Sequence, residues 1–156
     1  MRHRIAIALL LLGCALAAPS QAAKQDRGTP AEAKAMLDKA VEHFRTAGRE
    51  LALGDFTAGR APYRDRDLYV VCVNSRHTIV ANGGYPTFVG SSADALVDAN
   101  GTPLGKALWD AAGKNPSGSV TYPHVNPVTK KVEEKTTFYS KVADDLLCGV
   151  GAYAAG

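Results

Sequence analysis

The chain has 156 residues and a formal net charge of +3, with 18 lysines and arginines against 15 aspartates and glutamates. A chain of this length fits one domain. Its first 23 residues hold two of the basic residues and none of the acidic ones, so the remainder carries a charge of about +1, which argues against a nucleic-acid-binding surface.

Residues 1–23 have the parts of a secretory signal peptide. Arg2–Arg4 is basic, Ile5–Leu12 is an apolar run, and small residues with Ala-x-Ala-like cleavage sites follow. The run is too short to span a bilayer and no second one follows, so we expect an exported, periplasmic protein without a membrane span. Leu11–Cys14 loosely resembles a bacterial lipobox, which leaves a lipid anchor on Cys14 as the less favoured alternative.

A long helix is predicted next. Thr29 can cap its N-terminus, Pro30 suits the first helical position, and Glu32 completes a capping box. Apolar residues then recur at helical spacing, with the charged residues on the other face. The pattern predicts a helix over residues 30–53 that ends at Gly54 and packs one apolar stripe against a sheet.

The rest of the chain alternates strand-like runs with turns. Residues 54–66 are predicted as a loop, and residues 85–100 as irregular chain with a helical turn near 93–97. A short helix is predicted to begin at Thr102-Pro103 and to end at Gly113. The order of one long helix, two strands, a helical crossover and three strands indicates an α+β fold with a mostly antiparallel sheet. The five predicted strands are residues 67–73, 77–81, 119–125, 135–142 and 146–153.

Two cysteines remain beyond the signal peptide. Cys72 and Cys148 each lie in an apolar predicted strand, one near the start of the domain and one at its end. An exported protein meets an oxidising compartment, so a disulfide can form if the two strands are neighbours. Two buried free thiols acting as small apolar side chains are the equal alternative.

Polar residues on the later strands form a candidate binding site. Strand alternation places Tyr122, His124 and Asn126 on one face, and Lys135 on a face of the next strand. Lys135 suits a carboxylate as its counter-charge. Tyr122 and Tyr69 can each donate a hydrogen bond while their rings wall the site.

Several of these residues also have a simpler interpretation. Lys135 can be a solvated lysine at a strand end beside two glutamates, and Tyr69 suits the core as well as a pocket. His124 precedes a turn, which favours an exposed surface histidine. Gly149 and Gly151 alternate on the last strand and indicate close approach of another group; we expect that group to be the long helix rather than a ligand.

The order and spacing of the segments resemble a known family. DLYVVCV (67–73) follows the long helix, and FVGSSADALVDANGTPLGKAL (88–108), GSVTYPHVNPVTKKVEEKTTFYSKV (118–142) and GVGAY (149–153) come after it. This arrangement is similar to that of the single Cache domains, which are extracytoplasmic sensor modules with a PAS-like fold. The resemblance covers about residues 30–153.

The resemblance implies a five-stranded antiparallel sheet in the order 2-1-5-4-3. Strand one would then lie beside strand five, which makes a bridge between Cys72 and Cys148 geometrically feasible. A ligand pocket would lie between the sheet and the 85–100 segment, and the resemblance nominates Lys135 as a ligand contact. The chain would comprise the signal peptide, a tether over residues 24–29 and one Cache domain over residues 30–156.

We therefore expect a free-standing periplasmic sensor domain without its own output module, which binds a small molecule, in particular a carboxylate metabolite. The alternative is a structural or interaction module with a vestigial pocket, which dimerises or contacts a membrane sensor. A cavity on the order of a few hundred cubic ångströms with converging polar groups would favour the receptor, and a filled space the alternative.

No catalytic or metal-binding pattern is apparent in the sequence. The three histidines beyond the signal peptide are far apart, and there is no Cys-x-x-Cys motif. We expect no enzyme activity, no metal and no cofactor. A small hydrolase remains a remote third hypothesis, which requires His124 to contact Ser117 or Ser140.

Overall fold

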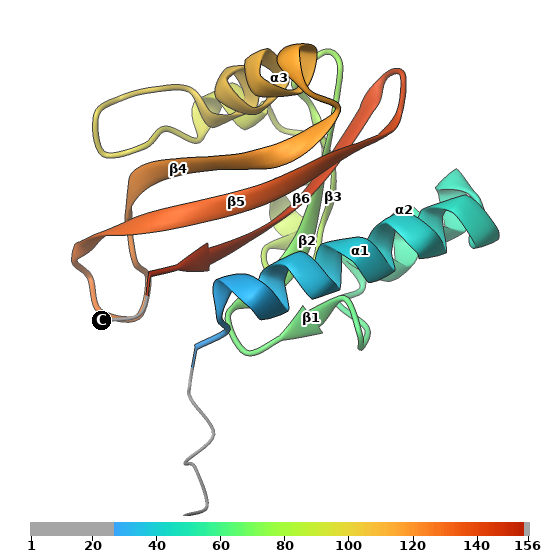
Figure 1. Ribbon diagram of the computed structural model, residues 1–156, viewed down its shortest axis with the longest axis horizontal. Helices are drawn as coiled ribbons and strands as arrows, with labels where there is room; N and C mark the ends of the chain where they lie inside the picture. The colour runs from blue at the N-terminus through green and yellow to red at the C-terminus, as the bar shows by residue number, and fades with distance from the viewer. Residues whose placement is uncertain (1–26, 155–156) are drawn as a thin grey trace, which may run out of the picture.

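The computed structural model describes residues 27–154, in which two helical layers cover the two faces of one curved antiparallel sheet (Figure 1). The predicted signal peptide, Cys14 and the first part of the predicted tether lie outside the described residues. Within the described residues, no helix combines the length and the apolar character needed to cross a bilayer.

The first helix, α1, spans Pro30–Ala47 and begins where the sequence predicts. The predicted capping box is present: the Glu32 backbone N–H donates to Thr29 Oγ1 at 3.2 Å, and the Thr29 backbone N–H donates to Glu32 Oε2 at 2.7 Å. These bonds satisfy amides that the first helical turn leaves without a partner. The buried stripe of the helix is Ala33, Met36, Leu37 and Ala40.

The prediction of one continuous helix to residue 53 is wrong. The helix breaks at Gly48, which has a φ of +83°, and α2 (Arg49–Thr57) continues in a new direction. Glycine adopts this conformation without the steric cost that other residues pay. The break brings Ala52 and Phe56 into the core, and Gly54, the predicted end, lies inside α2.

The sheet has the predicted strand order. Strands β2, β6, β5 and β4 pair in this order and β3 pairs with β2, which corresponds to 2-1-5-4-3 in the predicted numbering. An additional two-residue strand, β1, pairs with the start of β2 in a segment predicted to be a loop. The strands are β1 (Arg64–Asp65), β2 (Leu68–Asn74), β3 (Ile79–Asn82), β4 (Ser117–Val125), β5 (Val132–Ala143) and β6 (Leu146–Tyr153).

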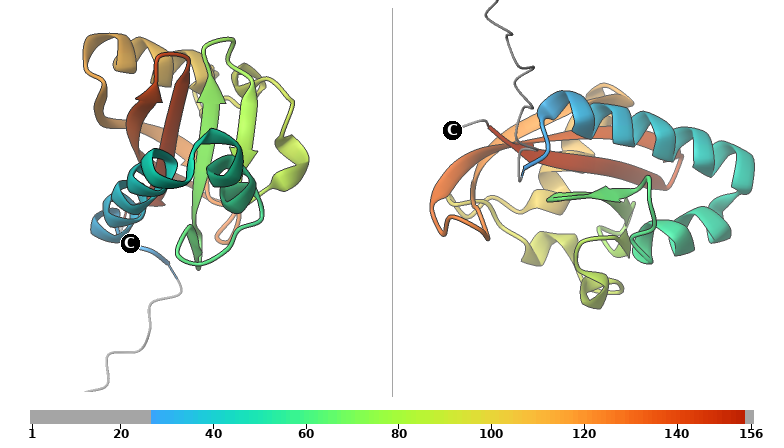
Figure 2. Two further views of the ribbon diagram at one scale, coloured as in Figure 1. Left: turned by 90° about the vertical axis from the view of Figure 1, so that its right-hand side faces the viewer. Right: turned by 90° about the horizontal axis from the view of Figure 1, so that it is seen from below.

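The two faces of the sheet are covered by different elements (Figure 2). On one face, α1 and α2 pack against alternate residues of β6, among them Cys148, Val150 and Ala152. Strand alternation turns the intervening residues of β6 to the other face, where Leu147 packs with residues of α3 (Leu104–Lys114). The crossover between β3 and α3 lies on this second face as well.

The crossover is held to the sheet by backbone and side-chain bonds. It contains two 3-10 turns, Pro86–Phe88 and Ala93–Ala95. The Ala93 N–H donates to the His77 carbonyl at 2.7 Å, and the Lys106 N–H donates to Asp94 Oδ1 at 2.7 Å. These bonds fix the start of α3 relative to the β2–β3 turn and leave a space between the crossover and the sheet.

Cys72 and Cys148 form a disulfide between β2 and β6. They are directly opposite residues in the register of these two strands. Both side chains are buried in the core beneath α1. The disulfide therefore joins two neighbouring strands near the beginning and the end of the domain, with the two cysteines 76 residues apart in sequence.

Candidate functional site

A hollow of about 680 Å³ lies on the face of the sheet that α1 does not cover. Its floor is formed by β2, β4, β5 and β6, and the crossover and α3 form its walls and cover. The volume falls within the range of roughly 300–1,000 Å³ that is typical of small-molecule sites. The filled space expected of a vestigial pocket is therefore not what the structure shows.

The strand register arranges the floor of this hollow in four successive rows. Residues of neighbouring rows are two positions apart along a strand, a separation of about 6.7 Å. The rows change from polar and aromatic at one end to aliphatic at the other. The first row is Tyr122, Lys135 and Tyr153; the second is Thr137 and Gly151; the third is Tyr139, Gly149 and Val71; and the fourth is Leu147, Val73 and Ile79.

Lys135 supplies the positive charge of the hollow. Its Nζ lies 4.8 Å from the ring centroid of Tyr153 and 5.7 Å from that of Tyr69. Among residues 27–154, no hydrogen bond or ion pair to this ammonium group is present beside these two ring contacts. Burial of a cation without an acidic partner is unfavourable, and an anion placed beside this ammonium group would offset that cost.

The surroundings also change the protonation of this lysine. Burial lowers the pKa of Lys135 from 10.5 to about 8, and the more distant Asp67 carboxylate opposes the shift. The residue is half-buried, because one side of it faces the hollow. Lys135 therefore remains mainly protonated at neutral pH and loses its charge in mildly alkaline solution.

Two of the predicted tyrosines line the hollow beside this lysine. The Tyr122 hydroxyl and Thr137 Oγ1 share a hydrogen bond of 2.7 Å. Tyr69 contacts Tyr85 edge-to-face at 5.7 Å, and Tyr85 stacks on Phe88 at 5.6 Å. Burial raises the pKa of both Tyr69 and Tyr122, so both remain neutral hydrogen-bond donors at physiological pH.

His124 also lines the hollow, although its sequence context favoured an exposed surface position. Its Nδ1 lies 3.0 Å from the hydroxyl of Tyr153 and 3.1 Å from the carbonyl of Val125. Burial lowers the pKa of His124, and the positive charge of Lys135 lowers it further. The imidazole is therefore mainly neutral at pH 7 and able to exchange hydrogen bonds with a polar ligand group.

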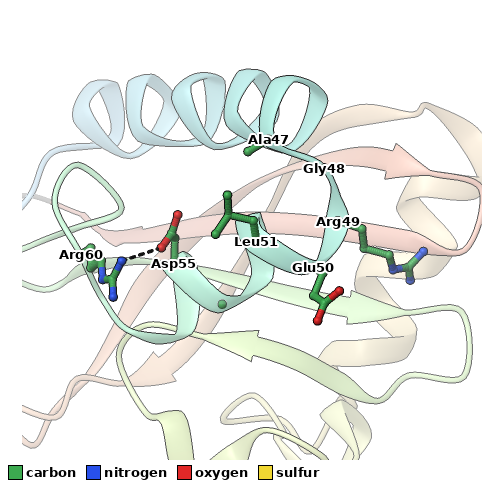
Figure 3. A pocket seen from close by; sticks show the side chains of 8 residues that line it. Ala47, Gly48, Arg49, Glu50, Leu51, Asp55 and Arg60 are labelled. Atoms are coloured by element: carbon green, nitrogen blue, oxygen red, sulfur yellow. Dashed lines mark hydrogen bonds and ion pairs between the residues drawn. The ribbon is translucent and has the colours of Figure 1, made fainter.

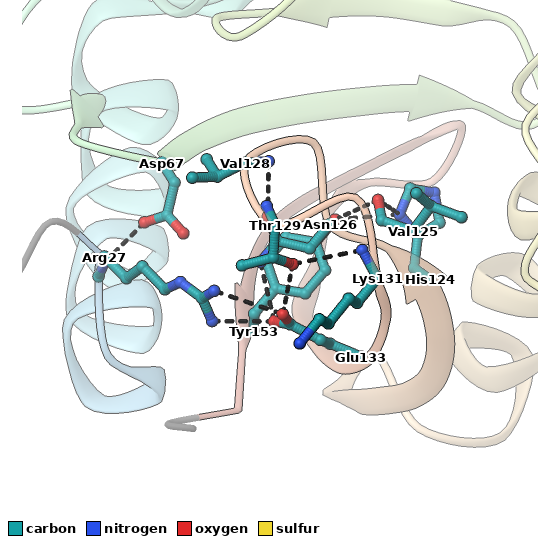
Figure 4. Close-up of polar contacts among 11 residues, drawn as sticks. Arg27, Asp67, His124, Val125, Asn126, Val128, Thr129, Lys131, Glu133 and Tyr153 are labelled. Atoms are coloured by element: carbon teal, nitrogen blue, oxygen red, sulfur yellow. Dashed lines mark hydrogen bonds and ion pairs between the residues drawn. The ribbon is translucent and has the colours of Figure 1, made fainter.

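Asn126 lies at the edge of the hollow and organises the β4–β5 turn (Figure 4). Its Oδ1 accepts from the Val128 N–H at 2.8 Å, and its Nδ2 donates to Glu133 at 2.9 Å. Glu133 also accepts from Thr129 Oγ1 at 2.5 Å and from Arg27 at 2.8 Å. These bonds give Asn126 a structural role; the ligand contact expected of it stays a prediction.

The two glycines of β6 lie beneath the hollow, and the expectation that they seat the long helix is wrong. A Cβ on Gly151 would lie 2.6 Å from Lys135 Cε, and one on Gly149 would lie 2.9 Å from the Phe138 carbonyl oxygen. Both positions face the hollow, since α1 packs against Val150 between them and against Cys148 and Ala152 on either side. Glycine here leaves room for the lysine side chain and for a ligand above the floor.

Sequence reasoning missed the aromatic and aliphatic parts of the lining. Tyr153 shares the alternation of Gly149 and Gly151 on β6, a signal that could have placed it on the same face. Tyr85 and Phe88 lie in the irregular crossover, where no periodicity assigns a side chain to a face. The aliphatic lining from the crossover and α3 comprises Ala93, Leu96, Leu104 and Leu108.

A second depression of about 710 Å³ surrounds the junction of α1 and α2 (Figure 3). It is lined by exposed residues such as Glu50 and Leu51, and Arg60 pairs with Asp55 at 3.1 Å inside it. Its charged groups are mostly paired, and it lies on the opposite side of the sheet from the first hollow. The converging polar groups identify the first hollow as the candidate site.

Neither a metal site nor a Ser–His pair emerges from residues 27–154. The described residues contain no group of three or more His, Cys, Asp or Glu side chains arranged to hold a metal ion. Ser117 pairs with Ser140 at the far end of the β4–β5 hairpin. His124 lies seven residues along β4, which corresponds to roughly 23 Å, so the contact required for a hydrolase is absent from this part of the chain.

Comparison with known proteins identifies the family to which this architecture belongs. The model of the single Cache domain 2 family matches residues 12–155, nearly the whole chain. No curated protein matches the sequence. The family match spans all of the strands that form the hollow.

Three solved structures share the fold. A methyl-accepting chemotaxis protein from Vibrio parahaemolyticus RIMD 2210633 is 20% identical with a TM-score of 0.62, covering 79% of this chain and 86% of its own. A Cache chemosensory domain described for carboxylic acid recognition is 14% identical with a TM-score of 0.55, covering 79% and 86%. A periplasmic sensor domain of a chemotaxis protein is 18% identical with a TM-score of 0.56, covering 79% and 88%. At these identities the likeness concerns the fold.

Proposed function

The chain belongs to the single Cache domain 2 family, and on that premise we propose that it is a periplasmic sensor domain whose hollow binds a small carboxylate. Lys135 supplies the charge that holds the carboxylate. Tyr122, Tyr69 and His124 supply hydrogen bonds and walls around it. Binding is non-covalent and involves no chemical step.

The observation that carries the proposal is the unpaired ammonium group of Lys135. The hollow brings this cation together with tyrosine hydroxyls and a neutral imidazole, and the described residues place no carboxylate within ion-pair distance of it. An incoming carboxylate would form a charge-assisted hydrogen bond there. One of the structural neighbours is described as recognising carboxylic acids, which agrees with this choice of ligand class.

Calorimetric titration of the purified protein with a panel of monocarboxylates and dicarboxylates tests the proposal. We expect at least one acid to bind, and at one hundred times its Kd it should stabilise the protein by about 2.7 kcal/mol. Lys135→Met should abolish binding. Lys131→Met is the matched control, because Lys131 lies in the same hairpin with an exposed side chain that does not line the hollow. Undiminished binding by Lys135→Met would refute the proposed site.

The pH dependence provides a second test of the same site. Because the pKa of Lys135 is about 8 in the free protein, the ammonium form that binds an anion is lost as the pH rises through that value. We expect the affinity for the carboxylate to decrease above pH 8, and the Lys131→Met protein to show the same decrease. An affinity that is constant from pH 7 to pH 10 would exclude Lys135 as the counter-charge.

The disulfide supports the periplasmic location. Cys72 and Cys148 are joined within the core, and structural disulfides persist in oxidising compartments such as the bacterial periplasm. Fractionation of cells that express the full chain should recover the protein in the periplasmic fraction, with both thiols blocked to alkylation. Recovery in the cytoplasm with free thiols would contradict this location.

A further inference from the structure

The polarity gradient along the floor of the hollow indicates the shape of the ligand as well as its charge. Resting on the proposed carboxylate site, we infer that the preferred ligand is a monocarboxylate with an extended apolar tail of about five carbons or more. The carboxylate lies at the first row of the floor, and the tail runs toward the fourth row and α3. Neither a two-carbon acid nor a dicarboxylate of the same length would satisfy both ends.

The lining at the far end of the hollow contains no cation; Lys141, in register with Leu147, lies outside this lining. Val71 lines the third row, the fourth row closes the end with Val73, Ile79 and Leu147, which are at most 4% exposed, and α3 adds Leu104 and Leu108 opposite them. Two polar groups that line this end are already bonded: Asn82 Oδ1 accepts from the Tyr85 N–H at 2.8 Å, and the Tyr139 hydroxyl donates to the Asn115 carbonyl at 3.3 Å. The buried Trp109 Nε1, which has no hydrogen-bond partner among the described residues, is not part of the lining. A second carboxylate here would lose its hydration without compensation.

The other charged groups of the lining lie near the β1–β2 connection and have partners of their own. Arg64 donates to the Gly83 carbonyl at 3.2 Å, and Arg66 is paired with Glu32 at 2.6 Å and Asp65 at 2.7 Å. The remaining acidic group of the lining, Asp67, accepts from the Gly28 N–H at 2.6 Å. Arg64 keeps its charge, because its partner is a carbonyl, but it lies opposite Tyr69 on β1 and not on the way to α3. A second carboxylate directed toward α3 therefore meets no cation of the lining, and one turned toward Asp67 would be repelled.

The dimensions of the floor suit an elongated molecule. The Lys135 side chain extends over Gly151 in the second row, and two further rows of about 6.7 Å each lead to Val73 and Leu147. The fourth row closes this path, because Val73 is 4% and Leu147 2% exposed. The open path therefore runs about 6.7 Å from Gly151 to the third row, where Gly149 provides a floor without a side chain. Each methylene buried along such a path is worth about a fourfold gain in affinity, which a two-carbon acid forgoes.

The test compares acetate, hexanoate and adipate, titrated into the purified protein by calorimetry. Hexanoate adds four methylenes to acetate, and adipate has the same length as hexanoate with a second carboxylate. We expect hexanoate to bind at least tenfold more tightly than either. Acetate or adipate binding as tightly as hexanoate would overturn the tail inference and leave the proposed function standing. Failure of every acid in the wider panel would overturn the proposed function itself.

A pair of variants locates the tail. Val71→Phe fills the third row from the sheet side, and we expect it to reduce the ratio of hexanoate to acetate affinity at least tenfold. Leu108→Trp fills the same space from α3 and serves if Val71→Phe loses its cooperative thermal transition. A ratio that stays at the wild-type value in a folded variant of either kind would show that the tail does not lie over these rows.

Discussion

The two faces of the sheet are built from the same strands, but one face is packed and the other borders a hollow. On the α1 face, the alternate residues of β6 are Leu146, Cys148, Val150 and Ala152, all fully buried. On the other face the alternation reads Leu147, Gly149, Gly151 and Tyr153, and the last three border a hollow. One face therefore holds the fold together, whereas on the other small residues give up packing to make room for a ligand. Substitutions on the two faces should consequently differ in kind, and not only in size.

The largest expected effect belongs to the packed face. Phe56 is completely buried between α2 and the sheet and contacts Tyr63 edge-to-face at 4.9 Å. Phe56→Ala should lower the free energy of unfolding by about 3–5 kcal/mol, because it removes buried surface and leaves a cavity. Leu51→Ala on the exposed side of α2, where the side chain is 59% exposed, is the control and should change stability by less than about 0.5 kcal/mol. Urea denaturation measures both, and equal losses would contradict the assignment of the core.

The disulfide is the second test of the packed face. The double variant Cys72→Ala/Cys148→Ala should lose about 2–4 kcal/mol of unfolding free energy, since the bond restricts a long loop in the unfolded chain. The wild-type protein measured with a reducing agent should show a similar loss, and ligand affinity should survive in the folded fraction. A double variant as stable as the oxidised wild type would show that core packing alone holds β2 against β6.

On the hollow face, removal of a charge should raise the free energy of unfolding, whereas the substitutions on the packed face should lower it. Lys135→Met should stabilise the ligand-free protein by about 1–2 kcal/mol at pH 7, a figure discounted for the water that the hollow admits. The pKa of Lys135 is about 8 in the folded protein against 10.5 in the unfolded chain, so the wild type pays this penalty below pH 8. As the pH rises from 8 to 10.5 the penalty disappears, and the two proteins should converge in stability. Thermal unfolding across this range is the measurement, and a variant less stable than the wild type at pH 7 would indicate that Lys135 supports the fold.

The smallest expected stability effect has the sharpest functional consequence. A methyl group at Gly151 would collide with Lys135 Cε, the flexible part of that side chain, and with Thr137 Oγ1 at 2.9 Å. Gly151→Ala should therefore displace the ammonium group and reduce carboxylate affinity at least tenfold, while stability changes by less than about 1 kcal/mol. Gly113→Ala on α3, where an added Cβ meets nothing within 4 Å, is the matched control. Unaltered affinity in Gly151→Ala would show that Gly151 does not shape the site.

Much of the fold was predictable because local patterns carry it. The capping box at Thr29 and Glu32, the run of β6 and the strand order implied by the family resemblance all agree with the structure. The predicted continuous helix failed at Gly48, which interrupts an otherwise helical pattern. The break accompanies the burial of Phe56, a tertiary contact that no local pattern contains.

The candidate site was predictable only in part, for the same reason. Alternation placed Tyr122 on a face of β4 and Lys135 on a face of β5, and the structure brings both to the hollow. It could not reveal that Asn126 is bonded within its own turn. Nor could it bring Tyr85 and Phe88 over Tyr69, since the crossover that carries them has no period.

The sequence by itself determined most of the helices and strands, and which side chains share a face of a strand, because capping and alternation act between neighbours in the chain. Only the tertiary structure decided which face is packed and which is hollow. That depends on where α1, α3 and the crossover settle on the sheet, and so on contacts between residues far apart in sequence. Gly149 and Gly151, which were expected to seat a helix, form the floor of the hollow because α1 packs against Cys148, Val150 and Ala152 on the other face.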